Sequence, residues 1–296
     1  MTSGTRRAHA KLNVFLRVLG RREDGYHDIQ TAVLPLELHD LVTVEEADQL
    51  EVMVTGDVGT ALEAAGGDSL CGRAAHAWAT AAGVGAPRAR ITIDKRIPVA
   101  AGLGGGSADA AATLLALDEL FGSSLSRAAL LEAAATVGSD VPALLMGEPV
   151  FVEGRGDRLV PLHTVTTHWV VRPFPFGVRS SDAYAWWDET PTSGPDPGAL
   201  VAAIEVGDDA LLGSAVFDDL QPAVASRHPE VERAVAAFGE AGALGAIMTG
   251  SGPTVVALAR HLGHADAVAE AVPGSVVTVS GPPTPPRTMT APSGVV

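Results

Sequence analysis

The chain has 296 residues, of which 47% are hydrophobic, and a formal net charge of −15 at pH 7. The length suits one large domain or two smaller ones, and the apolar fraction excludes a disordered protein. The acidic balance argues against duplex nucleic acid as the main partner, because proteins that bind it display basic faces. An anionic small ligand is still compatible with this charge, since its site needs only a few local donors.

Hydrophobic patterning and cysteine content bear on the compartment. No apolar run reaches the length of about 20 residues that a membrane span needs. The N-terminal stretch MTSGTRRAHAKLNVFL lacks a long apolar segment and a small-residue cleavage site, so we expect no signal peptide. The single cysteine, Cys71, cannot form an internal disulfide, which fits a reducing cytoplasm. We therefore expect a cytoplasmic protein that acts as a monomer or a weak homodimer, without nucleic-acid or membrane partners.

The first half of the chain mixes predicted strands and helices. Residues 8–20 read as a strand on which Lys11 and Asn13 share one face, because strand side chains alternate. Asp24-Gly25 breaks this pattern, which predicts a turn over residues 21–28. Further strands are expected at 40–47, 50–56 and 88–98, and helices at 69–83, 107–121 and 126–137.

The pattern restarts near residues 155–165, where we place a domain boundary. In this second unit, strands are predicted at 167–175 and 274–281, helices at 228–242 and 264–272, and two strands joined by a glycine turn within 245–259. The proline-rich residues 282–296 are expected to be loose or extended. The chain thus divides into residues 1–160 and residues 161–296.

A dense glycine run precedes the helix at 107–121. Gly102, Gly104, Gly105 and Gly106 are followed by Ser107, but no lysine follows as in a P-loop, and the spacing departs from the dinucleotide fingerprint. The loop leads into a helix whose first N–H groups carry the positive end of the dipole, and glycines let backbone amides approach an oxyanion closely. A phosphate-binding loop is therefore favoured over its alternative, a tight packing turn.

Four segments resemble the GHMP kinase superfamily, in order along nearly the whole chain. AKLNVFLRVLGRREDGYHDIQT, PVAAGLGGGSADAAA and MTGSGPTVVAL resemble its three motifs, and GSDVP resembles the segment that carries the catalytic aspartate. The resemblance implies an α+β fold with an N-terminal ATP-binding domain, 1–160, and a ferredoxin-like C-terminal substrate domain, 161–296. It also implies an ATP-dependent small-molecule kinase that uses ATP and Mg²⁺, of the form that phosphorylates a cytidine-bearing alcohol in the non-mevalonate route to isoprenoid precursors.

The resemblance assigns catalysis to Lys11 and Asp140. By chemistry alone, Lys11 could equally be an edge-strand lysine, and Asp140 a helix N-cap or turn aspartate ahead of a proline. In the family's pattern the aspartate is the general base that takes a proton from the attacking hydroxyl. The lysine keeps that carboxylate ionised and orients the hydroxyl.

The other site residues are carried over from the same motifs. Tyr26 and His27 are expected to hold the cytosine by stacking and hydrogen bonding, although both could be ordinary turn residues. Substrate binding is expected from Asn13, Tyr26, His27, Asp140, Ser180, Tyr184, Gly250 and Ser251. Nucleotide binding is expected from Lys95, Pro98, Gly102, Leu103, Gly104, Gly105, Gly106, Ser107 and Ala108. Ser107 is the candidate Mg²⁺ ligand.

The chain departs from the family's pattern at several places. Ser69 stands where an asparagine is common at the adenine, Arg179-Ser180 replaces a Ser-Thr pair, and Asp218 replaces the asparagine of an Asn-Asp-Leu segment. Two other functions stay open: another kinase of the superfamily, of the homoserine or mevalonate type, and a ligand-binding homologue without catalysis. The presence of both Lys11 and Asp140 argues against the second.

Overall fold

The computed structural model describes residues 3–56, 69–163 and 166–281. Its strands are β1 (Ser3–Arg21), β2 (His27–Glu46), β3 (Glu51–Gly56), β4 (Ala89–Lys95), β5 (Val150–Gly154), β6 (Arg158–Pro161), β7 (Thr167–Arg172), β8 (Phe217–Asp218), β9 (Gly245–Met248), β10 (Val255–Ala259) and β11 (Val276–Ser280). Its helices are α2 (Leu70–Ala81), α3 (Gly105–Phe121), α4 (Arg127–Val137), α5 (Val141–Met146), α6 (Ser180–Glu189), α7 (Gly198–Val206), α8 (Asp209–Ala215), α9 (Gln221–Ala225), α10 (Glu230–Glu240) and α11 (Leu262–Ala271). The proline-rich segment 282–296 lies outside the described residues.

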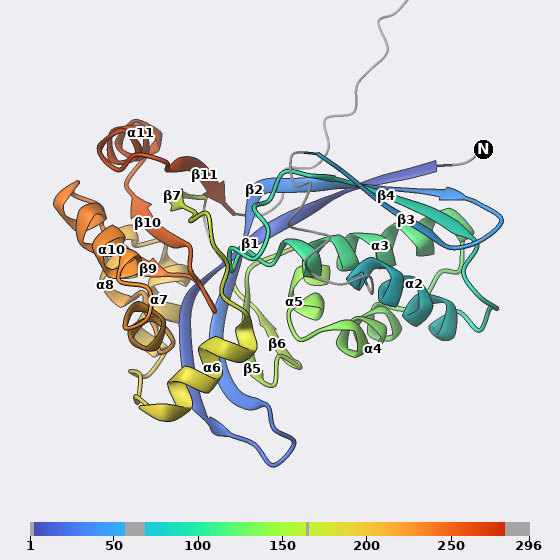
Figure 1. The fold of residues 1–296 in the computed structure, drawn as a ribbon, viewed down its shortest axis with the longest axis horizontal. Coiled ribbons are helices and arrows are strands. Elements are labelled where there is room, and N and C mark those ends of the chain that lie inside the picture. Colours follow the sequence, from blue (N-terminus) through green and yellow to red (C-terminus); the bar gives the residue numbers. More distant parts are fainter. Residues whose placement is uncertain (1–2, 57–68, 164–165, 282–296) are drawn as a thin grey trace, which may run out of the picture.

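A long antiparallel hairpin of β1 and β2 runs through both halves of the molecule (Figure 1). Strand β2 pairs with β4 and β5 of the first half and, through Ser280 and Leu36, with β11 of the second half. The strands therefore form one connected sheet system in the order β3-β4-β2-β11-β7-β10-β9 along its main path. The division at residue 160, which falls within β6, stays a prediction.

Helices cover the sheet separately in the two halves. Helices α2, α3, α4 and α5 gather beside strands β1–β4, whereas α7, α8, α10 and α11 lie with β7, β9 and β10 at the opposite end (Figure 1). Alanine and leucine side chains of α2, α3 and α4 bury one core against β2 and β4. A second core lies around Phe15 and Trp169, and a third packs α6 and α9–α11 against β7 and β10. Burial of this apolar surface is the main favourable term in folding.

Strand β1 is irregular where its polar residues lie. The pairing with β2 shifts register between His9 and Lys11 and again between Asn13 and Phe15. The backbone N–H of Lys11 donates instead to the carbonyl of Leu103, at 3.0 Å, in the glycine loop. Such irregularities re-aim side chains, and this one docks the loop directly onto the strand that carries Lys11.

The structure corrects several predicted elements. Strand β2 begins at His27, so the strand predicted at 40–47 is only its end, and the predicted turn shortens. Residues 31–36 of β2 are buried on both faces, so the alternation that marks a half-buried strand is missing there. Helix α3 begins at Gly105, ahead of Ser107, and the short elements α5–α9, β5 and β6 have no counterpart among the predictions.

Across the described ranges, no helix has the length and apolar character required to cross a membrane.

Candidate active site

A cavity of about 910 Å³ lies where the two halves meet. Its lining comes from the start of α2, the glycine loop, the polar face of β1, the β1–β2 turn, the start of α5, helix α6 and the β9–β10 turn. A concave site of this size holds a nucleotide-sized ligand.

Lys11 and Asp140 meet at this cavity. Lys11 is 4% exposed, and its Nζ lies 3.8 Å from Oδ2 of Asp140. Asp140 occupies the position before α5, yet its side chain makes no capping hydrogen bond and is 53% exposed. The carboxylate is therefore available to a ligand, with a buried ammonium beside it.

A hydrogen-bond network fixes the ammonium of Lys11 in place. Nζ donates to Oδ1 of Asn13, whose Nδ2 donates to Thr31 at 2.8 Å. The backbone N–H of Asn13 donates to Oγ1 of Thr249 at 2.8 Å, which ties β1 to the end of β9. The predicted strand face is thus correct. Both polar ends of the Asn13 side chain bind protein groups, and its predicted contact with substrate stays a prediction.

The glycine loop packs closely against strand β1 and the β9–β10 turn. Gly102 and Gly104 have φ of 78° and 70°, a region that favours glycine. A Cβ on Gly102 would lie 2.7 Å from the carbonyl oxygen of Thr249, and one on Gly104 would lie 2.9 Å from Cγ of Lys11. Close packing is therefore part of the reason for the glycines.

The same loop presents a helix N-terminus to the cavity. Helix α3 starts at Gly105, and Gly105, Gly106 and Ser107 all line the cavity. The first turn carries no acidic residue, and Gly104 at the N-cap position has no side chain that could occupy the free N–H groups. These amides and the helix dipole suit an anion such as phosphate.

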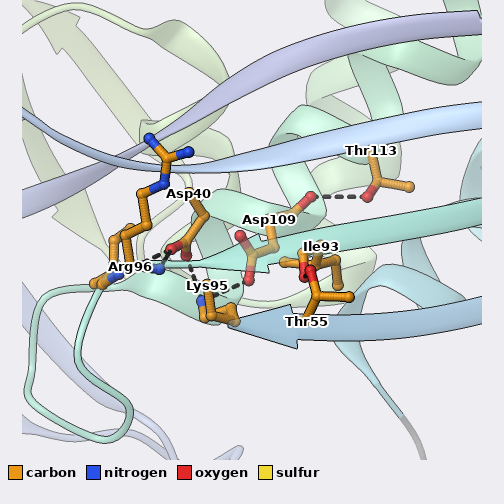
Figure 2. A network of polar contacts seen from close by, with 8 residues as sticks. Asp40, Thr55, Ile93, Lys95, Arg96, Asp109 and Thr113 are labelled. Atoms are coloured by element: carbon orange, nitrogen blue, oxygen red, sulfur yellow. Dashed lines mark hydrogen bonds and ion pairs between the residues drawn. The ribbon is translucent and has the colours of Figure 1, made fainter. Parts of the chain in front are cut away.

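Lys95 belongs to a buried ionic cluster beneath the loop. Figure 2 shows its ammonium between the carboxylates of Asp40 and Asp109; Nζ lies 2.7 Å from Oδ2 of Asp109 and donates also to Oδ2 of Asp40. Oδ1 of Asp40 accepts from the backbone N–H of Ile97 at 2.8 Å. The cluster thus links β2, β4 and α3 at the entry to the glycine loop. Although Lys95 lines the cavity, its charge is shared with two carboxylates.

Two carboxylates and one ammonium leave this cluster with an excess negative charge. Burial, with the nearby charge of Asp40, raises the pKa of Asp109 to about 7, against the opposing effect of Lys95. Oδ1 of Asp109 is buried and has no hydrogen-bond partner among the residues that the structure describes. The pKa of Lys95 is raised as well, because its two carboxylates outweigh its burial.

Aromatic and charged side chains form the other end of the cavity. The His27 ring stacks on Tyr184, with centroids 4.7 Å apart, and its Nε2 lies 2.8 Å from Oδ1 of Asp188. Tyr26 is 52% exposed, and the guanidinium of Arg155 lies 5.1 Å from the centre of its ring. Arg155 and Arg21 line this end, so it offers both aromatic faces and positive charge in an otherwise acidic protein.

Asp218 is another buried carboxyl, and it lies close enough to Lys11 to feel its charge. Burial raises its pKa well above the usual value, and the Leu220 N–H, followed by the charge of Lys11, opposes the shift. Burial likewise raises the pKa of the Tyr184 phenol, with contributions from the charges of Asp218 and Asp140. The phenol of Tyr184 is therefore protonated at neutral pH.

The structure gathers nearly all the predicted site residues. Those that line the cavity are Lys11, Asn13, Tyr26, His27, Lys95, Pro98, Gly102, Leu103, Gly104, Gly105, Gly106, Ser107, Asp140, Ser180, Tyr184, Gly250 and Ser251. Ser180 donates to Ser251 at 3.1 Å, which joins α6 to the β9–β10 turn. Ala108 is different: it is buried in the core, and its N–H donates to the carbonyl of Gly104. The binding roles of these residues stay predictions.

Three charged residues at the cavity, Arg21, Arg155 and Asp188, are not among the site residues assigned from sequence. Asp188 carried a usable signal, because Tyr184 and Asp188 are four residues apart and would share a face of any helix there. Helix α6 itself was not predicted, so this spacing had no structural context.

The fold and the cavity define a class of protein. The chain matches the family models for the GHMP kinases N terminal domain, over residues 69–148, and the GHMP kinases C terminal domain, over residues 200–277. The chain belongs to the GHMP kinase family, and it is an ATP-dependent small-molecule kinase.

Particular members of this family are similar to the chain over most of its length. A 4-diphosphocytidyl-2-C-methyl-D-erythritol kinase of Symbiobacterium thermophilum is 42% identical over 252 residues, which cover 84% of this chain and 88% of that protein. The Streptomyces avermitilis protein of the same name is 42% identical over 276 residues, covering 91% and 92%. A crystal structure of 4-(cytidine 5'-diphospho)-2C-methyl-D-erythritol kinase superposes with a TM-score of 0.77 at 33% identity, covering 94% of this chain and 99% of that one.

More distant structures share the fold. A homoserine kinase from Cytophaga hutchinsonii superposes with a TM-score of 0.73 at 21% identity, covering 95% of each chain. This likeness shows the architecture common to the family, and the predicted α+β GHMP kinase fold is confirmed.

Proposed function

We propose that this chain phosphorylates the 2-hydroxyl of 4-diphosphocytidyl-2-C-methyl-D-erythritol with ATP, a step of the non-mevalonate route to isoprenoid precursors. The observation that carries the proposal is the meeting of Lys11 and Asp140 in one cavity, with a glycine loop and a helix N-terminus on one side and an aromatic, cationic end on the other. The relatives that bear this substrate in their names match most of the chain.

The residues at the start of α3 fit a nucleotide phosphate chain. Gly105, Gly106 and Ser107 line the cavity at the uncapped helix N-terminus, and their N–H groups would bind phosphate oxygens. Ser69, Leu70 and Cys71 line the cavity as well, and they would lie towards the adenine. Bound ATP supplies the transferred phosphoryl group.

Magnesium would be held mainly by phosphate oxygens. Among the residues that the structure describes, no three His, Cys, Asp or Glu side chains gather as a metal site. Mg²⁺ prefers to keep several waters and to bind through substrate phosphates with one or two protein oxygens. Within the cavity lining, Ser107 and Asp140 offer such oxygens.

Asp140 would act as the general base. Its exposed carboxylate, free of a capping role, accepts the proton of the substrate hydroxyl as that oxygen attacks. Lys11, fixed through Asn13, lies beside this carboxylate and would offset negative charge as it develops. The remainder of the catalysis is positioning of the hydroxyl in line with the phosphoryl group.

The far end of the cavity would select the cytidine. Tyr26, His27 and Tyr184 provide aromatic faces for a pyrimidine, and Arg21 and Arg155 provide positive charge for a diphosphate. A homoserine or mevalonate substrate has no ring to use these groups. We propose further that the protein acts in the cytoplasm as a monomer or a weak homodimer.

A turnover assay tests the proposal. The purified chain is incubated with ATP, Mg²⁺ and either 4-diphosphocytidyl-2-C-methyl-D-erythritol, homoserine or mevalonate. We expect phosphorylation of the cytidine-bearing alcohol with a kcat/KM at least about 10³-fold above that of the other two. Homoserine and mevalonate lack the cytidine diphosphate group, whose binding energy would help to position the reacting hydroxyl. Preference for homoserine or mevalonate would assign another GHMP activity, and absence of turnover on all three would indicate a binding protein.

A further inference from the structure

One ring nitrogen of His27 is hydrogen-bonded to a carboxylate. Nε2 of this ring lies 2.8 Å from Oδ1 of Asp188. An ionised carboxylate can only accept a hydrogen bond, so Nε2 must carry a proton. A neutral imidazole has one N–H, which leaves a lone pair on Nδ1 and makes that atom an acceptor.

Surrounding groups keep this arrangement in place. Nη1 of Arg21 lies 3.6 Å from the second oxygen of Asp188, so this carboxylate pairs with a cation as well as with His27. Tyr184 stacks on the His27 ring, and the edge of Trp187 approaches it with centroids 5.9 Å apart. Tyr184, Trp187 and Asp188 all belong to α6. One helix therefore supplies both the rings that orient His27 and the carboxylate that its Nε2–H meets.

The free nitrogen of His27 is available to a ligand. Within the described part of the chain, no hydrogen bond is made by Nδ1, and the residue lines the cavity together with Tyr184 and Asp188. An acceptor at this position pairs with a donor and repels another acceptor. Cytosine presents an exocyclic amino group as a donor where uracil presents a carbonyl oxygen as an acceptor.

We infer that Asp188 is a specificity-determining residue, which holds the His27 proton on Nε2 so that Nδ1 selects a base with an exocyclic amine over one with a carbonyl. This inference rests on the proposed function, because it assumes that the base of a cytidine-bearing alcohol occupies the aromatic end. Asp188 acts through His27 as a positioning residue and need not touch the substrate.

Paired substrates test the inference. The kcat/KM of the unmodified enzyme is measured for the cytidine diphosphate alcohol and for its uridine counterpart, with ATP as donor. We expect a preference for cytidine of about 10- to 100-fold, the range of one good polar contact to a base edge. Asp188→Leu removes the acceptor and should lower this ratio at least about fivefold, while the KM for ATP stays unchanged.

A matched variant controls for general damage to helix α6. Glu189 is the next residue, its side chain is 59% exposed, and it pairs with Arg227 rather than with His27. Glu189→Leu should retain the parent ratio of cytidine to uridine. An unchanged ratio in Asp188→Leu, or an equal fall in both variants, overturns the inference.

A spectroscopic measurement tests the tautomer without any substrate. In the unmodified protein labelled with ¹⁵N-histidine, the His27 ring should show a protonated Nε2 and an unprotonated Nδ1 at neutral pH. Protonation of both nitrogens, or of Nδ1 alone, would refute the inference even if the cytidine substrate is turned over. Failure to phosphorylate either nucleotide alcohol, with the expected tautomer present, refutes both the proposed function and the selection built on it.

Discussion

The ammonium of Lys11 lies 3.8 Å from the carboxylate of Asp140, although one residue is in the middle of β1 and the other precedes α5. The two side chains differ in their surroundings, since Lys11 is buried and hydrogen-bonded whereas Asp140 is half exposed. A fixed cation beside a free carboxylate is the arrangement that a general base needs, because the base must stay ionised and still reach the substrate.

Replacement of this carboxylate should remove turnover and leave the fold intact. We expect Asp140→Asn to lower kcat by about 10²-fold or more, the usual scale for loss of a general base. The unfolding midpoint should hardly change, since Asp140 makes no capping hydrogen bond. The measurements are steady-state kinetics and calorimetric ATP binding, and a kcat within about threefold of the parent would rule out Asp140 as the base.

Much of the catalytic face could be predicted from sequence. Strand alternation places Lys11 and Asn13 on one face, and their hydrogen bond bears this out. The glycine run indicates a close backbone approach, and the packing of Gly104 against Lys11 is such an approach. The order of the four motif-like segments along the chain indicated the GHMP kinase family.

Long-range pairings could not be predicted from local patterns. Lys95 forms ion pairs with Asp40 because β4 pairs with β2, and no single-sequence pattern gives that register. Helix α6 mixes polar and aromatic residues and buries only Ala183 and Trp187, so its apolar period is too sparse to recognise. Asp188 and its contact with His27 were missed for this reason.

Gly104 is predicted to matter for activity through its contact with Lys11. A Cβ there would lie 2.9 Å from Cγ of Lys11, so Gly104→Ala should displace that side chain and lower kcat by about tenfold or more. Gly83→Ala is the matched control, since Gly83 has a similar φ of 65° and, apart from its chain neighbours, no described residue has an atom within 4 Å of an added Cβ. Both variants should lose about 1–2 kcal/mol of unfolding free energy from left-handed strain. Equal kcat values in the two variants would contradict the proposed packing effect.

The buried cluster around Lys95 predicts a pH dependence of stability. The pKa of Asp109 is raised from 3.8 to about 7, so the folded protein binds more protons than the unfolded chain in this range. This carboxyl therefore makes stability fall as the pH rises from about 4 to about 7, with no further change above it. Asp109→Asn removes this contribution, so its stability relative to the parent should rise by about 2 kcal/mol or more across the same range.

Urea unfolding at several pH values measures this difference. Asp94→Asn is the control, because Asp94 forms an exposed ion pair with Arg96 beside the cluster. Its stability relative to the parent should not vary with pH by more than a few tenths of a kcal/mol. If the unfolding free energies of Asp109→Asn and the parent changed with pH in parallel, Asp109 would be ionised in the folded protein throughout this range.

Tyr26 should contribute to substrate binding and not to the fold. Tyr26 is 52% exposed and its ring lies beside the guanidinium of Arg155, so Tyr26→Ala leaves the core untouched. Stacking of a base on an aromatic ring contributes about 1–3 kcal/mol, and KM for the cytidine substrate should rise by about 5- to 100-fold. The KM for ATP should hardly move, because the glycine loop lies at another part of the cavity lining.

The decisive comparison uses 2-C-methyl-D-erythritol 4-phosphate, which lacks the cytidine: kcat/KM for this poor substrate should be the same in Tyr26→Ala and the parent. An equal loss on both substrates would mean that Tyr26 supports the site in general and does not contact the base.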